Sequence, residues 1–395
     1  MLLETTLFLL LGIALYGLFI NKIRGLPPGP FPLPIVGNIL SLGLTASEMF
    51  TTLHKWKKQY GPVFTVYMPG PLVFMTTTET LQESLVRQGE IYAGRPPHHE
   101  SKKLLLGGNY GLAFMENHVY KEQRNFAINS LRELGTASSR LEDIIVNLGL
   151  EAVEKMKERE GTPFYIENDV LYCVANVIWN LAFGRFVTYG DPVFQAVLSL
   201  QTHPIMLLID FHPKLRLLDP LFGGPVKKLL EANDKYLEIF HQEIAMVEEH
   251  YEDGTARSYT EAFLQEVKNS SMEHRSGSFT RHQLTMAVYD LWSAAVATSV
   301  GSLRYSIHYL LNNPHIQVKM QAEIDEHIGS RAVRMDDQKN LHYVCAFIQE
   351  LQRVAYIGPL NLPHYTLAES TVGGFHLPSG TDVMPEFQMV TSDPE

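Results

Sequence analysis

Apolar residues recur every three or four positions over most of the chain, and this periodicity limits the fold more than any other feature. It extends from about Glu116 to Leu351 and is typical of helices with one buried face. Its clearest segments are Leu141 to Met156, Val170 to Phe183 and Leu229 to Val247. Few charges interrupt a longer apolar segment, Leu284 to Leu311, so we expect it to be a helix buried at the centre of the body.

Strand signals lie outside this helical region. Val63 to Tyr67 and Leu72 to Met75 are separated by a Pro-Gly-Pro turn, which predicts a two-stranded hairpin. Strand and turn signals return after residue 355, with Val372 to Leu377 before the turn at Pro378 to Gly380. We find no internal repeat or low-complexity tract. The predicted fold is mainly α with a small β part, in one domain over residues 39–395.

The N-terminus contains an apolar segment, Leu7 to Ile20, followed by Lys22 and Arg24. As a helix it covers about 21 Å, and residues 2–6 extend it toward the ~30 Å of a hydrocarbon core. The alternative is a cleaved signal peptide, which needs basic residues before the apolar run, whereas Glu4 precedes this one. We therefore predict an uncleaved membrane anchor over residues 1–25, with the body on the cytosolic side.

Five prolines fall between Pro27 and Pro34. They exclude a helix and favour a stiff, extended segment. We interpret residues 26–38 as a hinge or spacer between anchor and body; a ligand for an SH3-type domain is the alternative.

Charge and cysteine content exclude several classes of function. The formal net charge of -11 argues against nucleic acid as a partner. The two cysteines, Cys173 and Cys345, form neither a disulfide framework nor a Cys-x-x-Cys metal site, which indicates a reducing compartment. Dinucleotide, nucleotide and zinc-protease motifs are absent from the sequence.

A few polar residues are candidates for specific roles. Glu350 and Arg353 form the chain's single Glu-x-x-Arg, beside the apolar residues 344–348, so we expect a buried, structural ion pair. Tyr120, Lys121, Arg124 and Arg132 lie on one predicted helix, which is either a solvated face or a site for an anionic group.

Small residues cluster in the long apolar segment, over Ala294 to Ser299. They allow a close approach by another helix or by a flat cofactor. In the second case, the Thr298 hydroxyl is a candidate proton donor. Arg95 and His364 lie beside prolines in predicted loops and indicate no function by themselves.

In this order, the motifs resemble the cytochrome P-450 superfamily, in particular its microsomal, drug-metabolising animal branch. The resemblance covers essentially the whole chain. It rests on the anchor, residues 26–38, Tyr60 to Phe64, Tyr92 to Pro96, Tyr120 to Phe126, Asp290 to Trp292, Gln317 to Asp325, Glu350 to Arg353, Leu362 to His364 and Ser392 to Pro394.

The resemblance implies a mainly helical fold around a buried haem b, on the endoplasmic reticulum membrane. It implies insertion of one oxygen atom of O2 into small lipophilic substrates (xenobiotics, fatty acids or steroids), with electrons from an NADPH-dependent reductase. By position, the haem propionates would be bound by Arg95, Tyr120, Arg124 and His364, and Glu350 with Arg353 would hold the core. The substrate pocket would include Phe114, Ala294, Val296, Ala297, Leu360 and Leu362. A basic helix around Lys121 and Arg132 would face the reductase.

Four departures from the family pattern affect the predicted chemistry. Ala297 replaces the acid that organises proton delivery, and Ala295 replaces a glycine where oxygen would sit. Tyr120 replaces a tryptophan that bonds a propionate. The loop Phe-x-x-Gly-x-x-x-Cys-x-Gly, which supplies the axial thiolate, is missing from residues 1–395.

From this last departure we expect a C-terminally truncated, inactive monooxygenase with no metal ligand of its own. One alternative is a non-catalytic membrane protein that binds a lipophile or a partner. Another is a gene model from which exons are missing.

Overall fold

The structure is a computed structural model that describes residues 25–33, 36–43, 45–68, 70–97, 100–136, 139–159, 161–188, 191, 219–220, 224–252, 254–272, 277–355, 357–358 and 361–392. The predicted anchor, except for its last residue, and the predicted pocket residue Leu360 lie outside these ranges. Among the described helices, none is long and apolar enough to span a bilayer.

The chain forms two compact units. A sheet unit comprises residues 1–99, 208–213 and 358–395, and a helical unit comprises residues 100–207 and 214–357. The single domain expected over residues 39–395 stays a prediction.

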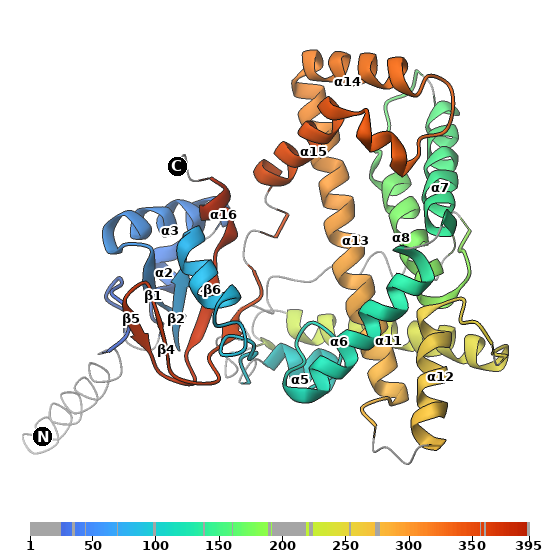
Figure 1. Cartoon of the computed structure of the whole chain (residues 1–395). Helices are drawn as coiled ribbons and strands as arrows, with labels where there is room; N and C mark the ends of the chain where they lie inside the picture. Colours follow the sequence, from blue (N-terminus) through green and yellow to red (C-terminus); the bar gives the residue numbers. More distant parts are fainter. Residues whose placement is uncertain are drawn as a thin grey trace, which may run out of the picture. The chain divides into compact units, whose positions relative to one another are not determined.

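The sheet unit contains a four-stranded sheet in the order β1-β2-β6-β3 (Figure 1). The hairpin predicted near residues 63–75 is confirmed, because β1 (Val63–Met68) pairs antiparallel with β2 (Gly70–Met75). β6 (Asp382–Pro385) runs parallel to β2 and pairs antiparallel with β3 (His364–Tyr365). Residues 372–377 are not one strand: β4 (Ser370–Val372) and β5 (Phe375–Leu377) form a second hairpin.

The described part of the sheet unit also contains helices. They are α2 (Ile39–Leu42), α3 (Ala46–Tyr60), α4 (Thr78–Leu81), which continues into a π-helical turn over Gln82–Val86, and α16 (Phe387–Thr391). α3 begins with a capping box, in which Thr45 and Glu48 each bind the other's backbone N–H. Its apolar face packs Leu53 and Trp56 against Phe64 of the sheet in one buried cluster.

The described part of the proline-rich segment lies against strand β1, and its role as a hinge or spacer stays a prediction. The backbone N–H of Thr65 donates to the Pro28 carbonyl at 2.9 Å, and the Thr65 hydroxyl donates to the Pro27 carbonyl at 2.8 Å. Asn38, 2% exposed, accepts a hydrogen bond from the Tyr67 N–H at 2.8 Å. Because proline carbonyls lack local N–H partners, this segment depends on the neighbouring strand.

The helical unit contains the elements that the periodicity predicts. Residues 141–156 lie in α7, 170–183 in α8 and 229–247 in α11, which confirms all three predictions. Among the residues that the structure describes, the α-helices of this unit are α5 (Glu100–Leu106), α6 (Asn117–Leu131), α7 (Ser139–Lys157), α8 (Glu167–Phe183), α11 (Pro225–Glu249), α12 (Tyr259–Met272), α13 (Arg281–Asn312), α14 (Pro314–His327) and α15 (His342–Ala355). α6 is followed by a π-helical turn over Arg132–Thr136. An aromatic core joins α8, α11 and α13, where Trp179 packs against Phe240 and Trp292.

Helix α13 is the long helix of this unit (Figure 1), but only its first half is buried. Leu284 and Ala287 are fully buried. Beyond Val300, in contrast, no residue of α13 is buried among the residues that the structure describes, and Leu311 is 70% exposed. The expectation of a helix buried at the centre of the body is therefore confirmed as far as Val300 and wrong for the residues after it. Apolar composition predicts that a helix has apolar faces, but it does not specify which of them another element covers.

Candidate functional site

Arg95 and His364, which are far apart in the sequence, lie close together in the sheet unit. The Tyr365 N–H donates to the Gly94 carbonyl at 2.8 Å, which aligns the two segments. Arg95 Nη1 donates to the Pro363 carbonyl at 3.0 Å. A side chain at Gly94 would not fit, since its Cβ would lie 2.6 Å from the Tyr365 carbonyl oxygen.

The imidazole of His364 is neutral at pH 7. Burial lowers its pKa from 6.5 to about 4, and the nearby charge of Arg95 acts in the same direction. Nδ1 lies 2.6 Å from the Tyr92 carbonyl oxygen, which can only accept, so Nδ1 carries the proton. Nε2 is therefore left with a lone pair. An incoming carboxylate would raise this pKa again, because a negative charge favours the imidazolium form.

Tyr120 and Arg124 form a second pair, on α6 of the helical unit. Arg124 Nη1 donates to the Tyr120 hydroxyl at 3.2 Å, as the spacing of four residues along a helix allows. Lys121 lies on the same helix, whereas Arg132 begins the π-helical turn that follows it. Arg124 and Lys121 are exposed, so this part of the helix presents positive charge at its surface.

The small-residue patch of α13 has one exposed and one buried side. Ala294, Ala297 and Thr298 are exposed. Val296, predicted to line the pocket, is 6% exposed and belongs to the core cluster of the helical unit. The Thr298 hydroxyl donates to the Ala294 carbonyl at 2.6 Å. To donate elsewhere, it must rotate away from this bond within the helix.

Glu350 and Arg353 form the predicted ion pair on α15. Arg353 donates from Nε to Glu350 Oε2 at 2.8 Å and from Nη2 to Oε1 at 2.6 Å, and these bonds lower the pKa of Glu350. Its predicted burial is wrong: the side chains of Arg353 and Glu350 are 48% and 59% exposed. The apolar residues 344–348 are not buried either, and Ile348 is 46% exposed; the buried residues of this helix are Leu351 and Ala355.

The two remaining described pocket candidates lie in irregular segments. Phe114 is half-buried between α5 and α6, and Leu362 is 36% exposed just before β3. The segment around Phe114 is held by Asp290 of α13, whose Oδ2 accepts a hydrogen bond from the Leu112 N–H. The sequence analysis did not predict this contact. A signal was present, because Asp290 is the one charged residue between Leu284 and Ala297.

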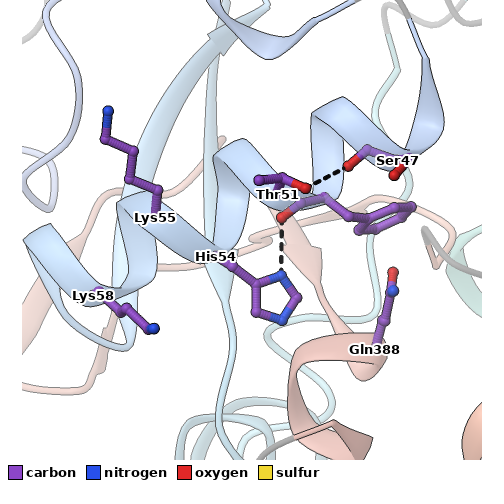
Figure 2. A pocket seen from close by; sticks show the side chains of 7 residues that line it. Ser47, Thr51, His54, Lys55, Lys58 and Gln388 are labelled. Atoms are coloured by element: carbon purple, nitrogen blue, oxygen red, sulfur yellow. Dashed lines mark hydrogen bonds between the residues drawn. The ribbon is translucent and has the colours of Figure 1, made fainter.

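A surface hollow of the sheet unit contains none of the predicted site residues. The residues that line it include His54, Lys55 and Lys58 of α3 and Gln388 of α16 (Figure 2). His54 Nδ1 lies 2.9 Å from the Phe50 carbonyl oxygen, so one ring nitrogen is already bonded within its own helix.

Comparison with known proteins identifies the family. The family model for cytochrome P450 matches residues 27–395. The chain belongs to the cytochrome P450 family. A probable cytochrome P450, CYP36A1, of Caenorhabditis elegans is 35% identical over 386 residues, which are 95% of this chain and 78% of the relative. Cytochrome P450 2A9 of Mesocricetus auratus is 30% identical and cytochrome P450 2B9 of Mus musculus 29%; the matches cover 95% and 98% of this chain and 76% and 80% of those relatives.

Membership in the cytochrome P450 family implies haem, and the two basic pairs suit its propionates. Each pair combines a guanidinium with a second polar ring, Arg95 with His364 and Arg124 with Tyr120. Guanidinium groups are well shaped for carboxylates.

The cysteines of residues 1–395 do not suit the axial position. Burial raises the pKa of Cys173, with a contribution from the charge of Glu151, and this disfavours the thiolate. Cys345 directs its thiol toward the Gln338 carbonyl, with Sγ 3.7 Å from the oxygen. We assign neither of them as the iron ligand.

Proposed function

We propose that this cytochrome P450 acts as a haem-dependent monooxygenase of small lipophilic substrates. The observation that carries the proposal is the family match over residues 27–395. When bound, haem b with a thiolate ligand supplies the reductive activation of O2. The comparisons give no support to the non-catalytic alternative, and it is not part of this proposal.

Two groups of residues would bind haem, one in each unit. Arg95 and His364 of the sheet unit, and Arg124 and Tyr120 of the helical unit, would bind the propionates. A carboxylate beside His364 would favour its protonated form, so haem binding should be accompanied by proton uptake at Nε2. Glu350 and Arg353 would act by positioning α15, which fits a pair that already binds within its own helix.

The exposed side of the α13 patch would face the reacting oxygen. Ala294 and Ala297 would leave room for a flat group, and the Thr298 hydroxyl would donate a proton after turning away from the Ala294 carbonyl. Without an acid at position 297, proton supply would depend on this hydroxyl and on water. Phe114, Val296, Leu360 and Leu362 would complete an apolar pocket for xenobiotics, fatty acids or steroids.

Location and electron supply are part of the same proposal and rest on the resemblance to the family's microsomal branch. An anchor over residues 1–25 would hold the protein at the endoplasmic reticulum membrane, with its body in the cytosol. Lys121 and Arg132 would attract the acidic surface of an NADPH-dependent reductase.

The test is the spectrum of the reduced protein with carbon monoxide, after isolation from native membranes. A strongly red-shifted Soret band, the sign of thiolate ligation, would support the monooxygenase, whereas a haem-loaded protein without this band would refute it. A polypeptide made of residues 1–395 alone should lack the band, because neither of its cysteines suits the axial position.

The propionate assignment is tested separately with the same protein. Arg95→Gln and Arg124→Gln should each weaken haem retention, measured by haem transfer to apomyoglobin. Arg281→Gln is the matched control, since Arg281 is exposed and bound to Glu248 of α11. Equal haem loss from all three variants would contradict the assignment.

A further inference from the structure

At the surface hollow of the sheet unit, a histidine and a serine from distant parts of the chain contact each other. His54 of α3 lines the hollow, and Ser392 is the residue directly after α16. Nε2 of His54 lies 3.3 Å from Oγ of Ser392. An imidazole nitrogen beside a serine hydroxyl is the arrangement of general base and nucleophile in many hydrolytic enzymes, and such contacts are often long before substrate binds.

The hydrogen bonds of His54 suit it to the role of a base. Nδ1 lies 2.9 Å from the Phe50 carbonyl oxygen, and because a carbonyl can only accept, Nδ1 carries the proton of the neutral ring. Nε2 therefore faces Ser392 with its lone pair. The Phe50 carbonyl thus orients the ring and selects its tautomer, which is the task of the carboxylate in a Ser-His-Asp triad.

Ser392 has a hydroxyl that two acceptors can share. Its Oγ donates to the Gln388 carbonyl at 2.7 Å. A rotation about the Cβ–Oγ bond turns the hydroxyl hydrogen from this carbonyl to Nε2 of His54 and leaves the oxygen in place. The pair is held in position by the packing of α16 on α3, since Met389 is 1% exposed in one buried cluster with Phe50.

The hollow provides space for a ligand and a positive charge beside the pair. Its volume is about 790 Å³, and the acidic residues are missing from its lining, whose charged side chains are Lys55 and Lys58. Within the part of the chain that the structure describes, neither lysine forms an ion pair. In the view of Figure 2, the His54 ring lies between Lys58 and Gln388. An ammonium group and an amide N–H at these positions can stabilise negative charge on an oxygen atom.

We propose that Ser392 and His54 form a catalytic dyad for acyl transfer from small esters. Ser392 Oγ attacks the ester carbonyl carbon while Nε2 of His54 takes the hydroxyl proton, and Nε2 then gives this proton to the departing alcohol oxygen. Water releases the acid from the acyl-serine, and its second proton returns to Oγ. The net reaction converts ester and water to acid and alcohol. It transfers no electrons, so it requires neither haem nor a reductase and goes beyond the proposed function.

Labelling of the purified full chain with a fluorophosphonate tests the nucleophile. Oγ of Ser392 should form a bond to phosphorus as fluoride leaves, with its proton taken by His54. Peptide mapping should place the label on Ser392 at a rate at least tenfold above that of Ser47, an exposed serine that lines the same hollow. Equal labelling of the two serines would overturn the proposal.

His54→Asn tests the base, because Nδ2 still donates to the Phe50 carbonyl but no atom replaces Nε2. This variant should slow the labelling of Ser392 at least tenfold. His250→Asn is the matched control, since His250 Nδ1 also contacts a carbonyl of its own helix, that of Met246 at 2.9 Å, and it should leave the rate unchanged. A rate in His54→Asn equal to that of the wild type would contradict the dyad.

A second readout covers the case in which His54→Asn loosens α16. With 4-nitrophenyl acetate, the wild type should release nitrophenol in a stoichiometric burst, because the acyl-serine accumulates. Ser392→Ala removes only a hydroxyl bonded within its own turn, and it should abolish the burst without moving the midpoint of urea unfolding. A burst that survives in Ser392→Ala would place the acyl group elsewhere and overturn the proposal. Since neither readout needs haem, such a failure would leave the proposed monooxygenase standing.

Discussion

The lowered pKa of His364, a predicted haem-binding residue, should make the unfolding free energy of the protein depend on pH. Its pKa falls from 6.5 to about 4 because the ring is buried and lies near Arg95. The unfolded chain therefore binds a proton at a pH where the folded chain does not. The stabilising contribution is fully present above pH 6.5, and it is lost as the pH falls toward 4.

The size of the effect follows from the separation of these two values, 6.5 and about 4. At about 1.4 kcal/mol per pH unit, it amounts to about 3 kcal/mol of unfolding free energy across the interval. Because the ring is only half-buried, partial access to water makes this figure an upper bound.

The perturbation is His364→Asn, in which Nδ2 takes the place of Nδ1 and still donates to the Tyr92 carbonyl. Urea unfolding from pH 7.5 to 4.5 should show the wild type losing stability relative to the variant as the pH falls. Other titrating groups are common to both proteins and cancel in the difference.

His250→Asn is the control, because His250 Nδ1 is also bonded to a backbone carbonyl oxygen, that of Met246 at 2.9 Å, but the side chain is exposed. It should leave the pH dependence of the wild type unchanged. A constant difference between wild type and His364→Asn over the whole pH range would refute the reasoning.

Two further predictions concern other buried polar groups of the sheet unit. Asn38→Ala should lower the unfolding free energy by about 1–3 kcal/mol, measured in urea, because the Tyr67 N–H loses its acceptor in the interior; an unchanged midpoint would contradict this. For Glu386, burial raises the pKa to about 7, so its contribution is present below pH 4.5 and is lost as the pH rises through about 7. Relative to the wild type, Glu386→Gln should therefore gain thermal stability between pH 5 and 8, and a loss over that range would show the opposite sign.

The helices and strands could be predicted from the sequence because apolar residues repeat at a different spacing in each kind of element. The helices α7, α8 and α11 were predicted from apolar spacing, and the β1–β2 hairpin from its turn. Burial could not be predicted in the same way. The second half of α13 is as apolar as a buried segment, and the Glu350–Arg353 pair has apolar neighbours in the sequence, but both are largely exposed. Burial depends on which element covers a face, and this is decided by distant parts of the chain.

The contacts of the candidate site were less predictable, for a related reason. Arg95 and His364 could be named by resemblance, yet their proximity depends on a long-range bridge between Gly94 and Tyr365. No local period encodes such a bridge. Glu350 and Arg353 are the contrasting case, because their contact spans three residues of one helix and could be predicted from spacing alone.

In both units, polar side chains hold irregular segments by hydrogen bonds to their backbone groups. Substitutions at these side chains can therefore alter function. A segment outside a helix or sheet must find partners for its backbone groups elsewhere. Asn38 provides a partner for the Phe31 carbonyl, His364 for the Tyr92 carbonyl, and Asp290 with Gln283 for residues 111–113. Two of these three segments carry or adjoin predicted site residues, Arg95 and Phe114. Substitutions at the supporting side chains should therefore shift the site through the backbone, even where they leave every predicted haem or substrate contact intact.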